Sequence, residues 1–149
     1  MLKREDIRIR DPFVLVDGEN KCYYMYGSTA LAEDGVYPPQ SFSVYKSADL
    51  ESFEEPIVVL DSQTQKLWAN DYYWAPEVHK YNGRYYLLGT MKAEGKCRGT
   101  LTFVADQPEG PFQPLSQVPV TPADWECLDG TLWVEDGKPT WCSATSGSR

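Results

Sequence analysis

The chain has 149 residues, of which 42% are hydrophobic, and its formal net charge is −8 at pH 7. This hydrophobic content suffices for the core of one modest domain, or of part of a larger one, and it argues against disorder. The negative charge argues against nucleic acid or an anionic membrane as a partner, but it leaves neutral ligands such as sugars open. Aromatic residues make up 13% of the chain. Flat rings suit the faces of sugars, and they equally suit β-sheets.

The N-terminal segment, MLKREDIRIRDP, contains no apolar run of the kind that forms a signal peptide. No stretch of the chain approaches the length of a transmembrane helix. The cysteines show no CxxC pair and no compact disulfide spacing. They are Cys22, Cys97, Cys127 and Cys142. These features predict a soluble, cytoplasmic protein with free thiols.

Three segments of the chain share one order of residues, which predicts three β-hairpins. The first, residues 13–28, consists of an apolar run, FVLV, a turn and a second strand, CYYMYGS. The same order recurs in residues 75–91 and in residues 128–141. Each hairpin is expected to turn at a dipeptide that tight turns favour. These dipeptides are Asp17-Gly18, Asn82-Gly83 and Asp136-Gly137.

Two further strand pairs are predicted between the hairpins, in residues 41–60 and 99–115. Each repeat unit therefore offers about four strands, which is the make-up of one blade of a β-propeller. Pro12, Pro76 and Gly130 mark equivalent points of successive units. We therefore predict an all-β fold, an incomplete β-propeller of about two and a half four-stranded blades, whereas propellers usually have about four to eight.

Short phrases near the start of each unit carry a resemblance to a known family. RDPFV near the N-terminus, WAPEV at residues 74–78 and LDGTLWVEDGK at residues 128–138 resemble the successive landmarks of glycoside hydrolase family 43. The phrases SADLESF and PEGPF are similar to phrases that this family has between its blades. The resemblance covers residues 7 to about 138. It implies a five-bladed propeller that hydrolyses arabinosides and xylosides of plant polysaccharides with inversion of configuration.

An inverting glycosidase needs one carboxylate as the base that activates water and one protonated carboxyl group that assists the leaving group. A third acidic residue can hold the pKa and the orientation of the proton donor. The resemblance implies that Asp11 is the general base and that Asp129 is the pKa-modulating aspartate. An ordinary turn role is the alternative for both, because Asp11 precedes a proline and Asp129 precedes a glycine.

The second unit offers candidate substrate-binding residues. Trp74 is a candidate platform for a sugar ring, with a place in the core as the alternative. Glu77 is a candidate substrate contact, or else it accepts hydrogen bonds from backbone donors. His79 is expected to be structural, and Glu109 is expected in an outer-strand loop and is not assigned as the acid. The resemblance places the general acid beyond the third motif, so we predict that this chain lacks it.

Residues 1–139 are predicted to form the N-terminal blades of a glycosidase domain, and residues 140–149, TWCSATSGSR, are an atypical tail. The resemblance implies that a strand followed by polar site residues would continue at this point. We hypothesise a one-nucleotide frameshift near codon 140, because a family-like strand read out of frame gives residues 140–147. A divergent end and a cloning remnant are the alternatives. Such a truncated form is expected to be inactive alone and to self-associate through exposed blade edges.

The implied hydrolysis requires two carboxyl groups and water, so neither a cofactor nor a metal site is expected. The expected partner is an arabino- or xylo-oligosaccharide. The sequence leaves open whether arabinose or xylose is preferred and whether the action is endo or exo. Two other function classes stay open as well: a sugar-binding module without catalysis, and a structural fragment without a ligand.

Overall fold

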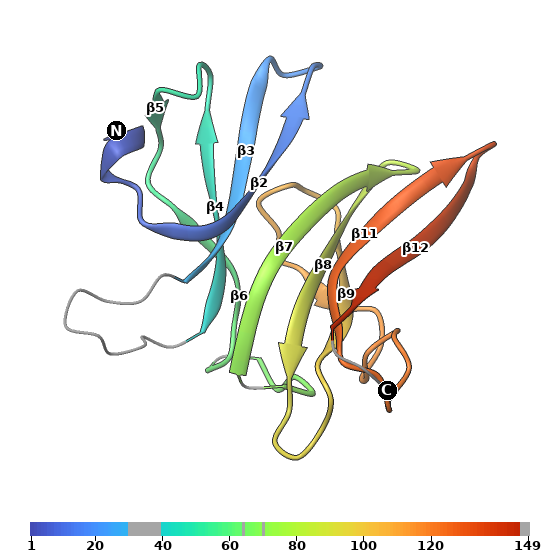
Figure 1. The fold of residues 1–149 in the computed structure, drawn as a ribbon. Helices are drawn as coiled ribbons and strands as arrows, with labels where there is room; N and C mark the ends of the chain where they lie inside the picture. The colour runs from blue at the N-terminus through green and yellow to red at the C-terminus, as the bar shows by residue number, and fades with distance from the viewer. Residues whose placement is uncertain (30–39, 64, 70, 147–149) are drawn as a thin grey trace.

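The computed structural model describes residues 1–29, 40–63, 65–69 and 71–146 (Figure 1). Within these ranges the chain forms β-strands and one short 3-10 helix, which confirms the predicted all-β class. The strands are β1 (Leu2–Lys3), β2 (Ile9–Asp17), β3 (Cys22–Thr29), β4 (Ser41–Ser47), β5 (Ser52–Phe53), β6 (Ile57–Asp61), β7 (Asp71–Tyr81), β8 (Arg84–Lys92), β9 (Gly99–Ala105), β10 (Gln113–Pro114), β11 (Cys127–Glu135) and β12 (Lys138–Thr145). The helix is η1 (Arg4–Asp6). The described part of the chain thus has no helix with the length and apolarity that a membrane span requires.

The strands form three antiparallel sheets that fan out side by side (Figure 1). In the first sheet the strand order is β1-β5-β4-β3-β2, and β6 also pairs with β4. The second sheet has the order β10-β9-β8-β7, and the third is the pair β11-β12. These sheets correspond to two propeller blades and the first two strands of a third, which confirms the predicted architecture.

The first sheet has more strands than the four expected, because two short strands, β5 and β6, share the place of the outer strand beside β4. β5 pairs with β4 at Ser47, whereas β6 pairs with β4 from Ser41 to Val44. Residues 54–56 separate the two short strands. A proline has no N–H group to donate to a sheet, so Pro56 interrupts the outer strand at that point. β1 then adds to β5 as an outermost strand of two residues.

Two of the three hairpin turns are tight, as predicted. Two residues with positive φ join the strands of each hairpin: Asn82 (47°) and Gly83 (76°) between β7 and β8, and Asp136 (50°) and Gly137 (72°) between β11 and β12. Positive φ at both central residues is typical of the type I′ turn, whose twist matches that of the paired strands.

The first hairpin differs from the predicted tight Asp-Gly turn. Asp17 pairs with Cys22, so a loop of residues 18–21 joins β2 and β3. The Asp17 carboxylate accepts hydrogen bonds from the backbone N–H groups of Glu19 and Asn20, both at 3.1 Å, and from the Asn20 side chain at 2.8 Å. These bonds hold the longer loop, and they lower the pKa of Asp17, the bond from the Asn20 side chain most strongly.

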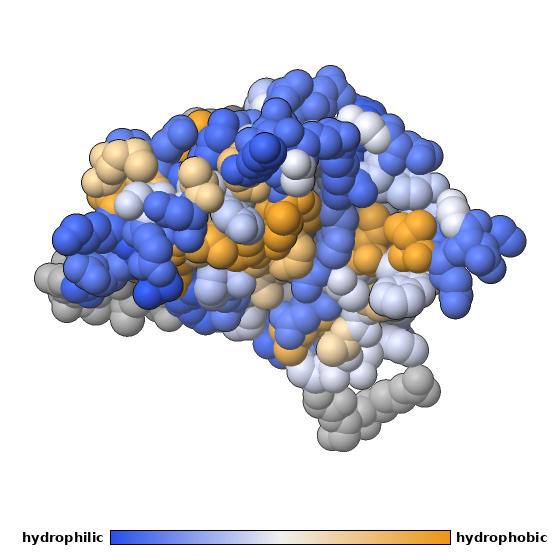
Figure 2. All heavy atoms as spheres, turned by 90° about the horizontal axis from the view of Figure 1, so that it is seen from above, coloured by the Kyte–Doolittle hydropathy of each residue, from blue (hydrophilic) through white to orange (hydrophobic). Residues whose placement is uncertain are grey.

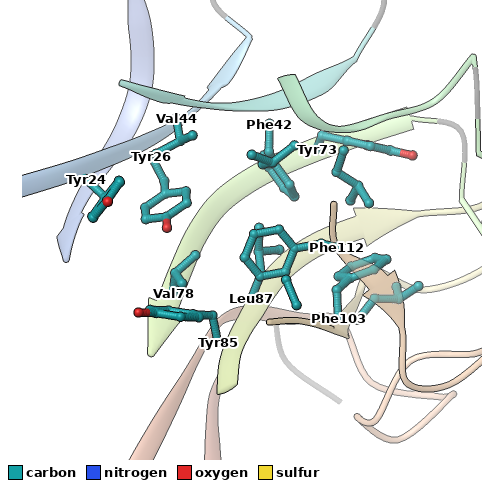
Figure 3. Packing of buried hydrophobic residues seen from close by; sticks show 14 of the residues in the cluster. Tyr24, Tyr26, Phe42, Val44, Tyr73, Val78, Tyr85, Leu87, Phe103 and Phe112 are labelled. Atoms are coloured by element: carbon teal, nitrogen blue, oxygen red, sulfur yellow. The ribbon is translucent and has the colours of Figure 1, made fainter. Parts of the chain in front are cut away.

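The hydrophobic core lies between the first and second sheets (Figure 3). Tyr26 and Phe42 enter it from the first sheet, Leu87 and Phe103 enter it from the second, and all four are fully buried. The Tyr26 hydroxyl donates a 2.7 Å hydrogen bond to the backbone carbonyl of Pro108. This bond satisfies a polar group inside the core, where an unpaired hydroxyl would destabilise the fold.

The first strand of each later sheet packs against the sheet before it. β7 contacts β2, β3 and β4, and β11 contacts β7, β8 and β9. Gly89 of β8 permits the close approach of the first two sheets, because a Cβ atom at this position would lie 2.5 Å from the ring of Phe42. The arrangement places β2, β7 and β11 in succession as the inner strands of the three sheets.

The first and third sheets also expose apolar side chains. Val16 of β2 is 66% exposed, and Trp133 of β11 is 61% exposed. Viewed from the end at which the hairpins turn, hydrophobic surface lies between hydrophilic residues (Figure 2). Every residue of β12 is exposed, including residues 140–145 of the predicted atypical tail, and residues 147–149 lie outside the described ranges.

Candidate active site

The three inner strands share a β-bulge at the same point of the repeat. Register shifts occur between Arg10 and Phe13 in β2, between Trp74 and Glu77 in β7, and between Leu128 and Thr131 in β11. In each bulge one residue has a positive φ: Asp11 at 49°, Ala75 at 45° and Asp129 at 50°. The bulges show that the three units are structural repeats, and they place Asp11 and Asp129 at corresponding positions.

The residues of these bulges suit the conformation. Aspartate adopts the left-handed region more readily than most residues, because its short polar side chain can bond locally. Gly130, which follows Asp129, has no Cβ atom; one built there would lie 2.3 Å from the methyl group of Thr100. A bulge bends its strand and redirects a side chain, and bulges are frequent beside active sites. Asp11 and Asp129 therefore lie within strands and not in turns between elements.

The Asp11 carboxylate is exposed, and its Oδ2 atom lies 4.0 Å from Nη2 of Arg10. The Ser28 hydroxyl donates a 3.2 Å hydrogen bond to the backbone carbonyl of Arg10, which ties the bulge of β2 to β3. The backbone beside Asp11 is thus fixed while its side chain is open to solvent. A carboxylate in this setting can accept a proton from a bound water molecule.

The Asp129 side chain is also exposed, and its backbone is anchored to the second sheet. The Asp129 N–H group donates a 3.0 Å hydrogen bond to the hydroxyl of Thr90 in β8. Thr90 is fully buried, so this bond holds the bulge of β11 against a rigid part of the fold. The third sheet is therefore fixed to the second at the residue that the sequence singled out.

Glu126, which directly precedes β11, makes a second anchor that was not expected from the sequence. Its Oε2 atom accepts hydrogen bonds from Nε of Arg98 at 2.8 Å and from the Arg98 backbone N–H at 2.9 Å. Its Oε1 atom lies 3.5 Å from Nζ of Lys92, and Nη2 of Arg98 also donates to the Ser146 hydroxyl at 2.8 Å. The bonds from Arg98, and then the charge of Lys92, lower the pKa of Glu126 to about 2.

Trp74 lies directly before the second bulge and is partly exposed. The ring of Tyr72 meets it edge to face with 4.8 Å between centroids, and the Arg98 guanidinium lies over it with Cζ 5.7 Å from the ring centroid. Trp74 is therefore held by two neighbours near the surface and is not part of the buried core. A fixed, partly exposed indole suits contact with a sugar ring. Its role in binding substrate stays a prediction.

Glu77 and His79 form a pair on β7, with 2.9 Å between Oε2 of Glu77 and Nε2 of His79. The His79 ring also contacts the ring of Phe13 in β2, with 5.3 Å between the centroids. His79 thus joins two inner strands, which supports the structural role expected for it. A substrate contact by Glu77 stays a prediction.

Other ionisable and reactive groups belong to other parts of the fold. Glu109 lies in the connection between β9 and β10, with Oε1 3.9 Å from Nζ of Lys46. This outer-strand position agrees with leaving Glu109 unassigned as the acid. In the ranges that the structure describes, no group of three or more His, Cys, Asp or Glu side chains is arranged to hold a metal ion. The four cysteines are unpaired.

The fold and the site together define a class of protein. Successive antiparallel blades with exposed carboxylates on their inner strands are the framework of a propeller glycoside hydrolase. The family model for glycosyl hydrolases family 43 matches residues 6–148, so the chain belongs to this family. No curated protein matches the chain.

Solved structures show the same fold. An endo-arabinase from Bacteroides thetaiotaomicron is 37% identical with a TM-score of 0.76, over 93% of this chain and 46% of that chain. A thermostable family-43 glycoside hydrolase is 27% identical with a TM-score of 0.73, over 88% of this chain and 39% of that chain. A family-43 enzyme from Xanthomonas citri, complexed with xylotriose, is 25% identical with a TM-score of 0.67, over 85% of this chain and 36% of that chain. The chain therefore spans less than half of the length of each of these structures.

Proposed function

We propose that the chain forms part of an inverting glycoside hydrolase that cleaves arabinose- or xylose-containing plant polysaccharides or oligosaccharides. Membership of glycosyl hydrolases family 43 supports this class of reaction. The similarity to an endo-arabinase and to an enzyme complexed with xylotriose supports a carbohydrate substrate. The higher identity to the endo-arabinase, 37% against 25%, favours an arabinose-containing chain.

In the proposed reaction, Asp11 accepts a proton from a water molecule while the water oxygen attacks the anomeric carbon. The bond from that carbon to the leaving oxygen breaks, and a general acid gives its proton to the leaving oxygen. Attack on the face opposite the leaving group inverts the configuration. The negative charge of Asp129 keeps the proton donor protonated before the reaction. No residue of this chain is assigned as that donor.

The matched bulges of β2 and β11 are the observation that carries the proposal. Both place an exposed aspartate in the left-handed region at the same point of the repeat. β7 contacts both strands, so the two bulges belong to strands that share one neighbour. Of the groups that glycoside hydrolysis requires, Asp11 would supply the base, Asp129 would supply the charge that tunes the proton donor, and the donor itself is not assigned to this chain.

The test uses substrates that need no proton donor. Glycosyl fluorides and dinitrophenyl glycosides of arabinofuranose and xylose have leaving groups that depart without protonation. The chain alone is expected to be inactive on ordinary glycosides, which need the missing proton donor, but it should hydrolyse these activated compounds above the uncatalysed rate, with inverted product seen by NMR. It should cleave alkyl glycosides far more slowly, because a missing general acid typically lowers the rate ~10²–10⁴-fold.

Two matched variants decide whether Asp11 acts in this reaction. Asp11→Asn should reduce hydrolysis of the glycosyl fluoride to the uncatalysed rate. Asp136→Asn is the control and should retain it, because Asp136 is also an exposed aspartate with φ near 50° but lies in a hairpin turn. Activity that survives Asp11→Asn, or a folded chain that cleaves no activated glycoside, would contradict the proposal.

Binding without cleavage is the second candidate function, and the fixed position of Trp74 between Tyr72 and Arg98 favours it. Calorimetry with arabinotriose and xylotriose should then detect binding by the chain. Trp74→Ala should weaken it, whereas Trp133→Ala, which removes a tryptophan that is 61% exposed elsewhere, should not. Equal affinity in both variants would show that Trp74 does not bind the sugar.

A further inference from the structure

A cavity of about 360 Å³ lies beside the anchor of the third sheet. The β8–β9 connection lines one side through Lys96 and Arg98, and the connection between β10 and β11 lines another through Val118 and Thr121. Trp68, from the connection between β6 and β7, contributes an aromatic wall. The volume is at the lower end of the range of about 300–1,000 Å³ that is usual for small-molecule sites.

The walls of this cavity are fixed by contacts outside it. Trp68 is partly buried and packs against the hydrophobic core. Arg98 is held by Glu126 and Ser146, and it lies over the ring of Trp74 on its other side. A preorganised wall lowers the entropic cost of binding a ligand. The cavity is therefore a site that already exists before a ligand arrives, and it shares Arg98 with the predicted substrate-binding tryptophan.

The charge of the lining is opposite in sign to that of the chain as a whole. Among the described residues, its charged side chains are those of Lys96 and Arg98 and none is a carboxylate, although the chain carries a net charge of −8. Arg98 is neutralised by Glu126, whereas Lys96 is exposed and makes no ion pair with any described residue. Glu94 and Asp124 are close in sequence but are not part of the lining. A ligand with one negative charge would complement Lys96.

We propose that this cavity binds a uronic acid residue of an oligosaccharide. The sugar carboxylate pairs with the Lys96 ammonium group, and the ring packs against the indole of Trp68. The Thr121 hydroxyl accepts a hydrogen bond from the backbone N–H of Thr100, so its own O–H can donate to a sugar oxygen. The inference rests on the proposed function for the choice of a sugar as ligand, and it extends that function to acidic side groups of plant polysaccharides.

The experiment compares two sugars that differ only at one carbon. Ligand-observed NMR or calorimetry on the whole chain measures the affinity for methyl glucuronide, which carries the carboxylate, and for methyl glucoside, which does not. The glucuronide should bind about tenfold more tightly, since a charge-assisted hydrogen bond of ordinary strength has about this effect. The difference should shrink as salt is added.

Variants of Lys96 assign the effect to the cavity. Lys96→Met should weaken glucuronide binding about tenfold and leave glucoside binding unchanged, whereas Lys96→Arg should retain the preference. Lys138→Met, which removes an exposed lysine from β12, is the matched control and should have no effect. Equal affinity for the two sugars, no binding of either, or equal losses in Lys96→Met and Lys138→Met would overturn the proposal.

Failure of this inference and failure of the proposed function give different results. Asp11→Asn should abolish hydrolysis of activated glycosides and leave glucuronide binding intact. A chain that binds glucuronide through Lys96 but cleaves no activated glycoside would refute the proposed function and keep the site. Hydrolysis that depends on Asp11, together with no preference for glucuronide, would support the proposed function and refute the uronic acid site.

Discussion

β8 and β12 occupy the same place in their repeats and are buried to opposite degrees. Each is the second strand of a hairpin with a two-residue turn, and Leu87 of β8 and Trp141 of β12 have equivalent partners, Val78 and Leu132. Most residues of β8 are buried, whereas every residue of β12 is exposed. The same pairing is therefore compatible with two very different surroundings.

The comparison separates what sets the register of a strand from what buries it. The turn and the bulge fix the register of both hairpins, because these are local features of two paired strands. Burial of β8 comes from outside the hairpin: β9 pairs with its other edge, and β11 packs on it. In the described structure β12 pairs with β11 alone. Its segment, KPTWCSAT, also lacks the apolar character of RYYLLGTMK in β8.

The largest expected effect is a matched pair of truncations in these two strands. Leu87→Ala should lower the free energy of unfolding by about 2–5 kcal/mol, because Leu87 is fully buried and a cavity would remain. Trp141→Ala should lower it by less than about 1 kcal/mol, because Trp141 is 40% exposed. Chemical denaturation of both variants measures the difference. Equal losses would mean that β12 is as well packed as β8.

A second change tests how the third sheet is attached to the second. Gly130→Ala should destabilise the chain by about 1–3 kcal/mol, because the added methyl group would overlap the side chain of Thr100. Thr100→Ala should relieve the clash, and the Thr100 hydroxyl that it removes makes no hydrogen bond within the described residues. A double-mutant cycle should therefore show favourable coupling. Strictly additive effects would show that the two positions do not touch.

The Glu126 anchor predicts a dependence of stability on pH. The pKa of Glu126 is lowered from 4.5 to about 2 in the folded state, so the anchor stabilises the fold fully above pH 4.5. That contribution should be lost progressively as the pH falls from 4.5 towards 2. Glu126→Gln should flatten the stability profile in this window, whereas Glu51→Gln, which removes an exposed surface carboxylate paired with Arg4, should leave its shape nearly unchanged. Parallel profiles for wild type and Glu126→Gln would contradict the anchor.

The smallest expected effect concerns self-association, which the exposed third sheet favours. Sedimentation should show concentration-dependent association of the chain, since unpaired edges and exposed apolar side chains promote contact between copies. Trp133→Lys should shift the equilibrium towards the monomer, because Trp133 is 61% exposed on β11. Leu115→Lys is the control, since Leu115 is also exposed but lies outside the three sheets' inner strands. A concentration-independent monomer would exclude this association.

Much of the fold could be predicted because the repeats are marked locally. Pro12, Pro76 and Gly130 identified equivalent points, and the structure has a bulge at each. The turns at residues 82–83 and 136–137 followed from dipeptides whose backbone preference is intrinsic. Local features of this kind do not depend on the rest of the fold, which is why they could be read from the sequence.

The parts that could not be predicted depend on contacts between distant residues or on side chains that redirect the backbone. The Asp17 carboxylate captures the following N–H groups, which turns an expected two-residue turn into a longer loop. Glu126 and Arg98 meet only because the third sheet packs on the second. The cavity beside Trp68 is formed by three separate connections, so no single stretch of sequence could indicate it.

The middle bulge carries Ala75 where its two counterparts carry aspartate. All three residues adopt the left-handed backbone conformation with positive φ, so the shape of the bulge does not depend on a carboxyl group. A methyl group here acts as an uncharged spacer on the strand that contacts both aspartate-bearing strands. The alanine thus keeps the repeat's backbone shape without adding a third negative charge to the inner strands.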